Sequence, residues 1–241
     1  MANGSHSFDS SADNHPAVLA EKLTRLYPMG TEQVVGVQDI DLHVPAGELV
    51  VIKGESGSGK STLLALLAGL DRPTTGRLLV AGLAIENASA SQLTDFRRNS
   101  VGIVFQSFNL LPTLNVMENV CLPALLAGKE HDRVKARAHE LLSWLRMEGR
   151  STHFPSQLSG GEMQRTAIAR ALINEPAIIL ADEPTGNLDS RNGRAVVELL
   201  AELNRDHCRT VIIATHGTLA DRYATSVILL KDGSIADRSG R

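Results

Sequence analysis

Two hydrophobic patterns alternate along this chain. Short uninterrupted apolar runs, each followed by polar residues and glycine, occupy four segments: Glu48–Lys53, Val101–Phe105, Ala177–Ala181 and Thr210–Thr215. Between them, apolar residues recur at helical spacing. Strands that are buried on both faces read as continuous hydrophobic runs. The alternation therefore predicts an α/β core around a mainly parallel sheet.

Both ends of the chain have strand patterns of another kind. Val18–Leu23 and Val34–Val44 alternate in polarity on either side of a predicted turn at Pro28-Met29-Gly30, which favours antiparallel strands in an N-terminal β-subdomain. Ser226–Ala236 has two apolar runs around Asp232-Gly233, the dipeptide of a tight hairpin.

The middle of the chain predicts helices. Val116–Ala127 and Arg133–Met147 have helical periodicity, with breaks at Pro112 and Pro155. We expect one domain over residues 16–241 in which a helical subdomain, at about 107–159, is inserted. Met1–His15 is rich in small polar residues and is expected to be a disordered tail.

Composition excludes several classes of protein. The 241 residues carry a net charge of −3. This charge does not favour binding to nucleic acid or to an anionic membrane surface, both of which attract basic proteins. The two cysteines, Cys121 and Cys208, belong to no C-x-x-C pair and are expected to be buried small hydrophobes in a reducing cytoplasm. No apolar run approaches the length of about 18 residues needed for a membrane span, so we expect a soluble chain that is not secreted.

The most informative motif follows the Glu48–Lys53 run. Residues Gly54 to Thr62 fit G-x-x-x-x-G-K-[ST], and Leu63–Ala68 reads as the helix that begins after Lys60. Glycines let the backbone N–H groups converge on a phosphate, while the lysine adds charge and the Ser61 hydroxyl is a ligand for Mg²⁺. A glycine-rich turn with a lysine nearby is the alternative. The predicted ATP-binding residues here are Gly54, Glu55, Ser56, Gly57, Ser58, Gly59, Lys60, Ser61 and Thr62.

Two carboxylates end the Ala177–Ala181 run. Asp182 and Glu183 would lie at the carboxyl end of a parallel strand, where such sheets bind ligands. Asp182 is expected to hold Mg²⁺ through a water molecule, and Glu183 to polarise the water that attacks the γ-phosphate. The alternative is a pair of solvated acids.

A second glycine turn precedes a predicted helix. Leu158-Ser159-Gly160-Gly161-Glu162 comes before apolar residues at helical spacing, from Met163 to Leu172. These five residues match the L-S-G-G-[EQ] signature of the ATP-binding-cassette (ABC) ATPases, and from Ala17 to Ala236 the chain resembles that family. The resemblance implies a P-loop NTPase fold, an α/β ABC ATPase core. It also implies a homodimer in which the signature reaches ATP bound to the other subunit.

The resemblance assigns roles to other residues. Tyr27 matches the aromatic that stacks on adenine, although a lone tyrosine is more often a packing residue. Gln106 matches the glutamine that contacts Mg²⁺ and the attacking water, so the implied metal site consists of Ser61, Gln106 and Asp182. His216 matches the histidine that binds the γ-phosphate, the alternative being a surface histidine. Asn187, Leu188 and Asp189 match a loop that crosses the dimer interface.

The chain departs from the family pattern at two positions. Gly217 stands where an aspartate is common after the histidine, which bears on packing of that turn, and Met163 after the signature is a smaller variation. Three stretches, at 70–74, 105–114 and 182–189, are most similar to the lipoprotein-release and macrolide-export branch.

The implied function is ATP hydrolysis in a transport complex. The chain would work with integral membrane permease subunits at the cytoplasmic face of the inner membrane, coupling dimer closure to export or extraction of a substrate. Phe108–Leu126 would dock the partner's helices, unless it is only the core of the helical subdomain. A mechanical regulator of a membrane or cell-wall partner, without cargo, has the same motifs. Soluble ABC ATPases of translation or DNA repair would have tandem cassettes, zinc modules or coiled coils, and a P-loop kinase would not need the signature.

Overall fold

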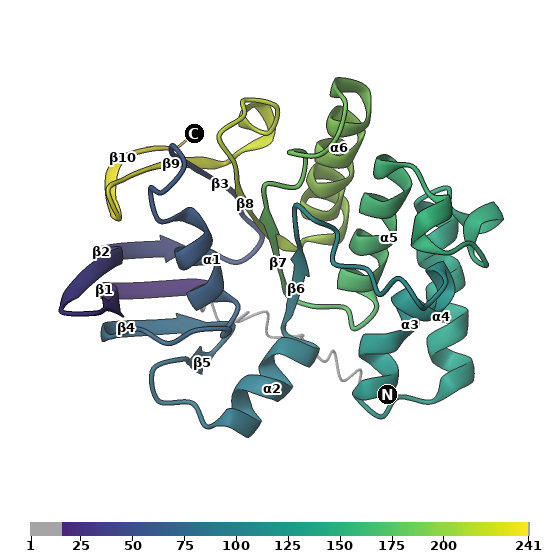
Figure 1. Ribbon diagram of the computed structural model, residues 1–241, viewed down its shortest axis with the longest axis horizontal. Helices are drawn as coiled ribbons and strands as arrows, with labels where there is room; N and C mark the ends of the chain where they lie inside the picture. The colour runs from purple at the N-terminus through teal and green to yellow at the C-terminus, as the bar shows by residue number, and fades with distance from the viewer. Residues whose placement is uncertain (1–15, 241) are drawn as a thin grey trace, which may run out of the picture.

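Two β-sheets form the frame of residues 16–240, the part of the chain that the computed structural model describes (Figure 1). A four-stranded antiparallel sheet lies on one side, and helices cover the opposite side of a six-stranded sheet. The predicted N-terminal tail, Met1–His15, lies outside the described residues.

The six-stranded sheet has the order β10-β9-β3-β8-β7-β6, and all its neighbours are parallel except the β9–β10 hairpin. The strands are β3 (Leu49–Lys53), β6 (Val101–Val104), β7 (Ile178–Asp182), β8 (Thr210–Ala214), β9 (Ser226–Lys231) and β10 (Ser234–Gly240). All four predicted parallel strands and the hairpin are confirmed. Asp232 and Gly233 both have positive φ, at 49° and 79°, as a two-residue hairpin turn of this type requires.

Both faces of this sheet are buried, which explains the continuous apolar runs. In β3, Val50 and Ile52 belong to the core shared with the antiparallel sheet, whereas Leu49 and Val51 belong to the core under the helices. Successive side chains of a strand point to opposite faces, so every residue of the run needs to be apolar.

The antiparallel sheet has the order β2-β1-β4-β5. Its strands are β1 (Val18–Met29), β2 (Glu32–Val44), β4 (Thr75–Val80) and β5 (Leu83–Ala84). The predicted β1–β2 pair is confirmed, but β1 continues through Pro28 and the turn lies at Gly30-Thr31. Proline is tolerated there because β4 pairs with β1 only as far as Thr24, leaving no strand to receive the missing N–H.

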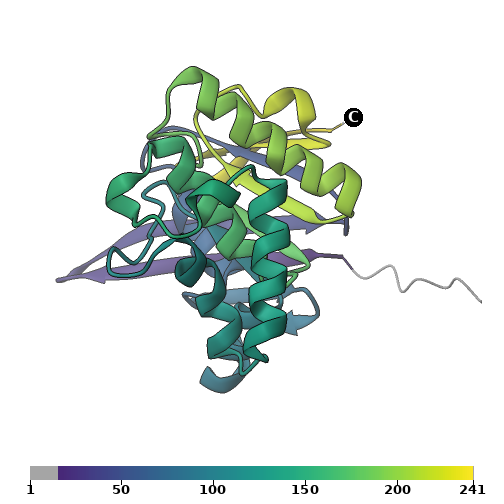
Figure 2. The ribbon, with the colours of Figure 1, turned by 90° about the vertical axis from the view of Figure 1, so that its right-hand side faces the viewer.

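Six α-helices complete the described fold, and Figure 2 shows those of the helical side from the front. They are α1 (Lys60–Leu67), α2 (Ala90–Asn99), α3 (Val116–Leu126), α4 (His131–Trp144), α5 (Gly160–Leu172) and α6 (Ser190–His207). Short 3-10 turns occur at η1 (Glu148–Arg150), η2 (Pro155–Gln157) and η3 (Asp221–Tyr223). The helices α2, α3 and α5 each begin with a capping box. In this motif the side chain before the helix accepts from the backbone N–H three residues later, and the side chain of that later residue accepts from the backbone N–H of the first.

Some elements were not predicted. The pattern assigned nothing to β4, β5, α2 and α6, although the capping box formed by Ser89 and Gln92 was a usable signal for α2. Of the two cysteines, Cys121 is buried as expected, but the prediction for Cys208 is wrong. Cys208 ends α6 in a left-handed conformation with φ 51° and is exposed, because the chain reverses direction there into β8.

Candidate active site

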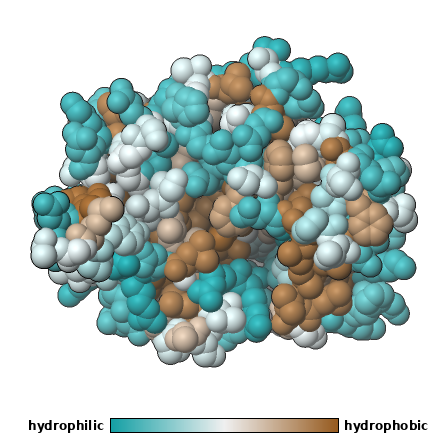
Figure 3. Space-filling model, viewed as in Figure 1, coloured by the Kyte–Doolittle hydropathy of each residue, from teal (hydrophilic) through white to brown (hydrophobic). Residues whose placement is uncertain are grey.

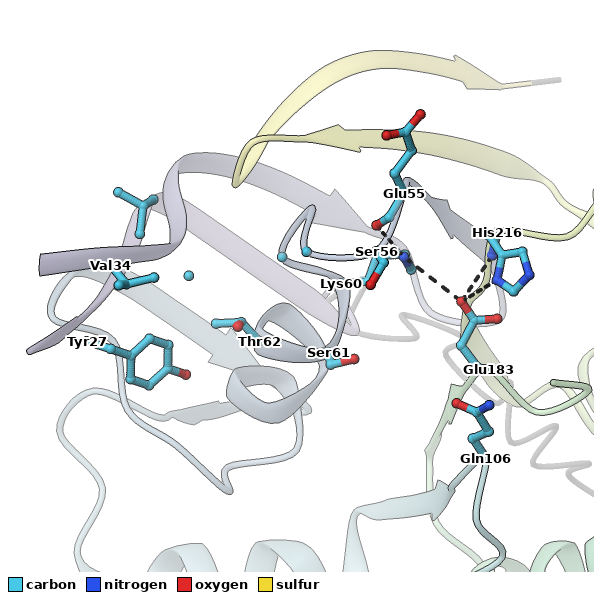
Figure 4. A pocket seen from close by; sticks show the side chains of 14 residues that line it. Tyr27, Val34, Glu55, Ser56, Lys60, Ser61, Thr62, Gln106, Glu183 and His216 are labelled. Atoms are coloured by element: carbon cyan, nitrogen blue, oxygen red, sulfur yellow. Dashed lines mark hydrogen bonds and ion pairs between the residues drawn. The ribbon is translucent and has the colours of Figure 1, made fainter. Parts of the chain in front are cut away.

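A cavity of about 800 Å³ opens at the carboxyl ends of the parallel strands (Figure 4). The loop after β3 forms one wall, and the residues just beyond β6, β7 and β8 form another, represented by Gln106, Glu183 and His216. The β1–β2 hairpin closes the third side with Tyr27, Val34, Val35 and Gly36. Parallel sheets bind ligands at this edge, and the fold here brings together Tyr27, most of the predicted glycine-loop residues, and Gln106, Glu183 and His216.

The glycine loop has the backbone that only glycine adopts easily. Gly57 and Gly59 have φ of 81° and 101°. A side chain on Gly59 would come within 2.5 Å of the Gly36 carbonyl oxygen in β2. The β9–β10 turn also supports the loop, because the Gly233 N–H donates to the Ser58 carbonyl at 3.1 Å. The loop is thus held by segments from both ends of the chain.

Lys60 begins α1 and is buried in the cavity wall. Its ammonium donates to the carbonyls of Gly54 and Glu55 at 2.8 and 2.9 Å, while the Glu55 side chain points away (Figure 4). An ammonium has three donors, so one remains for an anion. Of the predicted loop residues, Gly54 and Ser58 do not line the cavity. The Ser58 hydroxyl is buried without a hydrogen-bond partner among the described residues.

Ser61 lines the cavity and contacts Asp182, which does not itself line the cavity. The Ser61 hydroxyl donates to Asp182 Oδ1 at 3.3 Å. Burial raises the pKa of Asp182, and the neighbouring charge of Glu183 raises it further, against the opposing effects of Ser61 and Lys60. A cation at this carboxylate would remove part of that penalty. The hydroxyl of Ser61, the carboxylate of Asp182 and the amide oxygen of Gln106 are the oxygen ligands that Mg²⁺ prefers.

The same ligands are too few for a protein-only metal site. Among residues 16–240, no group of three or more His, Cys, Asp and Glu side chains is arranged to hold a metal ion. Mg²⁺ is commonly bound by one or two carboxylates together with phosphate oxygens and water. The donor set therefore fits Mg²⁺ that arrives with a nucleotide.

Glu183 lies opposite Lys60, with 4.0 Å between Oε1 and Nζ. Its carboxylate accepts from the Thr215 hydroxyl at 3.0 Å, and from the His216 backbone N–H and ring Nδ1 at 3.2 and 3.0 Å (Figure 4). The backbone of Glu183 is left-handed, with φ 43°, which costs on the order of 1 kcal/mol for a residue with a Cβ. Strain that is held in place at the centre of a cavity is typical of a functional residue.

Gln106 is hydrogen-bonded to the loop that follows β7. The Asn187 side chain donates to the Gln106 carbonyl at 3.0 Å, and the Gln106 amide nitrogen lies 3.4 Å from Asn187 Oδ1. A Cβ at Gly186 would come within 2.7 Å of that amide nitrogen, so this glycine makes room for the Gln106 side chain. The amide nitrogen is thus occupied, and the amide oxygen has no partner among the described residues.

Tyr27 is fixed from two sides. Its hydroxyl donates to Asp71 Oδ2 at 2.8 Å, and the Arg25 guanidinium lies 4.5 Å from the ring centroid. Burial would raise the pKa of Asp71, but the hydrogen bonds from Tyr27, Arg72 and Arg25 outweigh it and lower the pKa. Because Arg25 covers one ring face, a nucleotide base has only the other face for stacking.

The signature residues lie elsewhere. The cavity wall, as residues 16–240 form it, includes none of Leu158, Ser159, Gly160, Gly161 and Glu162. Ser159 instead caps α5. A Cβ at Gly160 would approach the Leu188 side chain at 3.3 Å, and one at Gly161 would approach Asn192 at 2.5 Å. Asp189 caps α6 by accepting from the N–H groups of Arg191 and Asn192. The predicted signature and interface loop therefore pack against each other, outside the cavity.

Sequence reasoning missed several contributors. Thr215, Arg25 and Asp71 position predicted residues, and Val34, Val35 and Gly36 line the cavity. Only Thr215 had a signal, as a hydroxyl at the end of a buried strand. At Gly217, the backbone N–H donates to Thr215 Oγ1 at 3.0 Å and an added Cβ would make ordinary contact, so the backbone does not require glycine there.

Comparison with known proteins identifies the relatives of this arrangement. The family described as ABC transporter matches residues 37–186. The macrolide export ATP-binding/permease protein MacB of Rhodopseudomonas palustris (strain HaA2) is 49% identical over 217 residues, which are 90% of this chain and 33% of that protein. The uncharacterized ABC transporter ATP-binding protein MJ0796 of Methanocaldococcus jannaschii is 42% identical over 222 residues, which are 89% of this chain and 93% of that protein. The chain thus spans about a third of the length of the MacB relatives.

Solved structures agree with the fold. The ATP-binding cassette MJ0796, solved as a dimer in a post-hydrolysis state bound to ADP and Pi, has a TM-score of 0.86 and 40% identity over 92% of this chain and 98% of that one. CbiO1 from Clostridium perfringens, described as part of the ABC transporter complex CbiONQ, has a TM-score of 0.83 at 28% identity, over 93% of this chain and 88% of that one. Among the described residues, none of the helices combines the length and the apolarity that a membrane crossing requires.

Proposed function

Since this chain belongs to the ABC transporter family, we propose that it binds and hydrolyses ATP and that the ATP cycle of two paired copies moves a membrane partner. The α/β ABC ATPase fold is that of the family. The observation that carries the proposal is the Glu183 carboxylate, which faces Lys60 across the cavity and is held by Thr215 and His216.

ATP would bind with its phosphates in the loop from Gly54 to Thr62. Backbone N–H groups at the start of α1 and the remaining donor of Lys60 suit the β- and γ-phosphates. Tyr27, with its free ring face, suits the adenine, and Val34 and Val35 supply apolar contacts beside it. The relative MJ0796, bound to ADP and Pi, supports a nucleotide at this site.

Mg²⁺ would be held by Ser61, Asp182 and Gln106 together with phosphate oxygens. Bound there, the ion supplies charge neutralisation for the departing phosphate. The contact between Ser61 and Asp182 supports this assignment, because it brings a hydroxyl and a carboxylate to one point.

Glu183 would orient and deprotonate the attacking water. A carboxylate has about four lone-pair positions. Oε1 already accepts two hydrogen bonds from His216, and Oε2 accepts one from Thr215. The remaining position on Oε2 is therefore the one available to a water molecule. His216 would reach the γ-phosphate through Nε2–H in its imidazolium form, in which Nδ1 also donates to Glu183. The Gln106 amide oxygen remains for the metal or the water.

Two copies of the chain would pair around ATP. Leu158 to Glu162 lie outside the cavity of their own chain, which supports a role at the nucleotide of a second copy. Asn187, Leu188 and Asp189 pack against these residues and would cross the same interface. The dimeric cassette structures of MJ0796 support a homodimer.

The membrane partner would be an integral permease, with this chain at the cytoplasmic face of the inner membrane. The MacB relatives, described as ATP-binding/permease proteins for macrolide export, support export or extraction of a substrate. Apolar side chains gather over α3 on the face shown in Figure 3, where Leu125 and Leu126 are exposed. Since Val116, Val120 and Ala124 are buried, the segment 108–126 supplies both core and surface. We assign its exposed leucines, with Leu111, to the dock.

One other function fits the same site. A mechanical regulator of a membrane or cell-wall partner would use the identical ATP cycle without carrying cargo. The MacB relatives favour transport. Purifying the chain together with its membrane partner would distinguish the two functions, because only a transport partner would contain a pathway for a substrate.

The decisive experiment replaces Glu183 by glutamine. The substitution Glu183→Gln keeps the size of the side chain but removes the base, so ATP turnover should fall about 100-fold or more while ATP affinity is retained. Size-exclusion chromatography with ATP and Mg²⁺ should then show a trapped dimer. Asp221→Asn, which changes a carboxylate paired with Lys53 outside the cavity, is the control. Turnover close to wild type in Glu183→Gln would refute the proposed base.

A further inference from the structure

A second cavity, separate from the candidate active site, lies between α4, α5 and α6. Its volume is about 220 Å³. In Figure 1, α5 lies between the other two helices. The cavity reaches the end of α6, because His207 and Arg209 line it. Leu141, Leu172 and Leu203, each at least 95% buried, form its floor, and the Trp144 side chain forms one wall. A dry, apolar cavity of about 150 Å³ is large enough to hold a benzene ring.

The acidic groups around this cavity are already paired. Arg137 donates to Glu140 at 2.8 Å and lies 3.4 Å from Glu175. The Trp144 indole N–H donates to Glu202 at 2.7 Å. The charges of Glu140 and Glu175 are therefore already balanced by Arg137, which disfavours a cationic ligand at these carboxylates.

Arg209 is different. Its backbone is anchored, because its N–H donates to the Leu203 carbonyl at 3.2 Å and its own carbonyl accepts from Asn204 at 2.9 Å. Within residues 16–240, by contrast, the guanidinium makes no hydrogen bond and no ion pair, although the residue lines the cavity. His207 lies beside it and packs edge-on against Trp144, with 6.0 Å between ring centroids.

We propose that this cavity binds a small aromatic carboxylate. The ring lies on the leucine floor against Trp144, and the carboxylate accepts from the Arg209 guanidinium, which has the fork geometry that recognises carboxylates. The ligand contacts both α4 and α6, two helices that Trp144 already links through Glu202 and His207. This site does not depend on ATP and stands apart from the function proposed above.

Phenylacetate is a suitable probe, and the protein contains its own reporter. Trp144 is the one tryptophan of the sequence, so its fluorescence reports on this cavity alone. With about ten non-hydrogen atoms, phenylacetate should bind with a dissociation constant on the order of 1 mM. Titration should change the Trp144 emission saturably, and the melting temperature should rise with ligand concentration.

Charge selectivity is tested on the wild-type protein. Phenylacetamide, which is neutral, and phenethylamine, which is cationic, should each bind at least about 5-fold more weakly than phenylacetate. Equal or tighter binding of phenethylamine would overturn the proposal, as would an unchanged Trp144 emission up to about 20 mM phenylacetate.

The role of Arg209 is tested by Arg209→Met, which retains an apolar stem of similar length. Phenylacetate binding should weaken about 10-fold while phenylacetamide binding stays the same. Arg194→Met, on the exposed side of α6 away from the cavity, is the matched control and should bind like wild type. Equal affinity of Arg209→Met and wild type for phenylacetate would refute the assignment of the carboxylate to Arg209.

Discussion

One oxygen of Glu183 accepts two hydrogen bonds from a single residue, His216. The backbone N–H and the ring Nδ1 of His216 lie 3.2 and 3.0 Å from Oε1. The Thr215 hydroxyl binds the other oxygen, Oε2, at 3.0 Å. The carboxylate is thereby fixed on both sides, and one acceptor position, on Oε2, has no donor among the described residues.

Removing the Thr215 hydroxyl should slow hydrolysis without weakening ATP binding. Thr215→Val has nearly the same shape but loses the donor to Oε2, worth about 1 kcal/mol or somewhat more, so kcat should fall about 10-fold. Thr215→Ser keeps the hydroxyl and should stay within about 3-fold of wild type. Steady-state ATPase assays with a separate measurement of nucleotide affinity test this. A change confined to KM would contradict the positioning role.

A bulky charge at Ser159 should block the pairing of two copies. Ser159 caps α5, so part of any effect of Ser159→Arg is loss of the cap, about 1 kcal/mol of stability. Ser159→Ala loses the same cap without adding bulk and separates the two causes. We expect ATP binding in both variants, dimer formation in Ser159→Ala, and neither dimer nor turnover in Ser159→Arg. Normal turnover in Ser159→Arg would refute a site completed by a second copy.

A charge on the proposed dock should separate ATP hydrolysis from transport. Leu111 is 44% exposed, so Leu111→Glu should lower stability by less than about 1 kcal/mol and leave the ATPase of the isolated chain intact. Co-purification with the membrane partner, and transport, should be lost. Leu229→Glu changes an equally exposed leucine on β9 and should assemble normally. Normal transport by Leu111→Glu would place the dock elsewhere.

Two glycines of the phosphate loop should differ in their tolerance of alanine. Gly57 and Gly59 both have positive φ, which costs an alanine about 1 kcal/mol. At Gly59, the added methyl group would also meet the Gly36 carbonyl at 2.5 Å, whereas at Gly57 it meets nothing within 4 Å. We expect Gly59→Ala to lose about 1 to 3 kcal/mol more of unfolding free energy than Gly57→Ala in urea titrations. Equal losses would contradict the packing of the loop on β2.

The Arg150–Glu162 pair should make stability depend on pH. The hydrogen bond from Arg150 is the largest cause that lowers the pKa of Glu162 from 4.5 to about 2, and Ser159 adds to it while burial opposes it. A lowered folded pKa stabilises the protein above the unfolded pKa, and this stabilisation is lost as the pH falls from about 4.5 towards 2.

Solvent screening limits the size of that effect, because the Arg150 side chain is 48% exposed. About 1 kcal/mol is expected at pH 7. Unfolding free energies of wild type and Glu162→Gln should therefore differ by about that amount at pH 7 and converge as the pH falls from about 4.5 towards 2. A difference that stays the same across this range would contradict the ion pair.

The parts of the site that could be predicted are those with local causes. The loop from Gly54 to Thr62 needs glycine at left-handed positions and a lysine at the helix start, and both requirements appear within nine consecutive residues. The strand ends that carry Asp182, Glu183 and His216 follow runs whose apolar character reflects burial on both faces. The turn at Asp232-Gly233 was predictable for the same reason.

Other features depend on segments that are distant in sequence. Thr215, Gly36 and Asp71 acquire their roles from contacts with Glu183, Gly59 and Tyr27, and such partners leave no local signal. The strands β4 and β5 escaped prediction because their bounds are set by pairing, of β4 with β1 and of β5 with β4. Cys208 is exposed because the path of the chain reverses there, which residue type does not reveal.

The sequence by itself determined the phosphate loop, the α/β core, the family and the acidic pair, since each arises from chemistry between neighbouring residues. Only the tertiary structure decided that β9 lies beside β3, that the β1–β2 hairpin closes the cavity, and that Leu158 to Glu162 lie outside it. The second cavity, with Arg209 at its wall, likewise exists only after α4, α5 and α6 pack together. The physical reason is the same throughout: strand order and helix packing are set by long-range burial of apolar surface, which many different local sequences satisfy equally well.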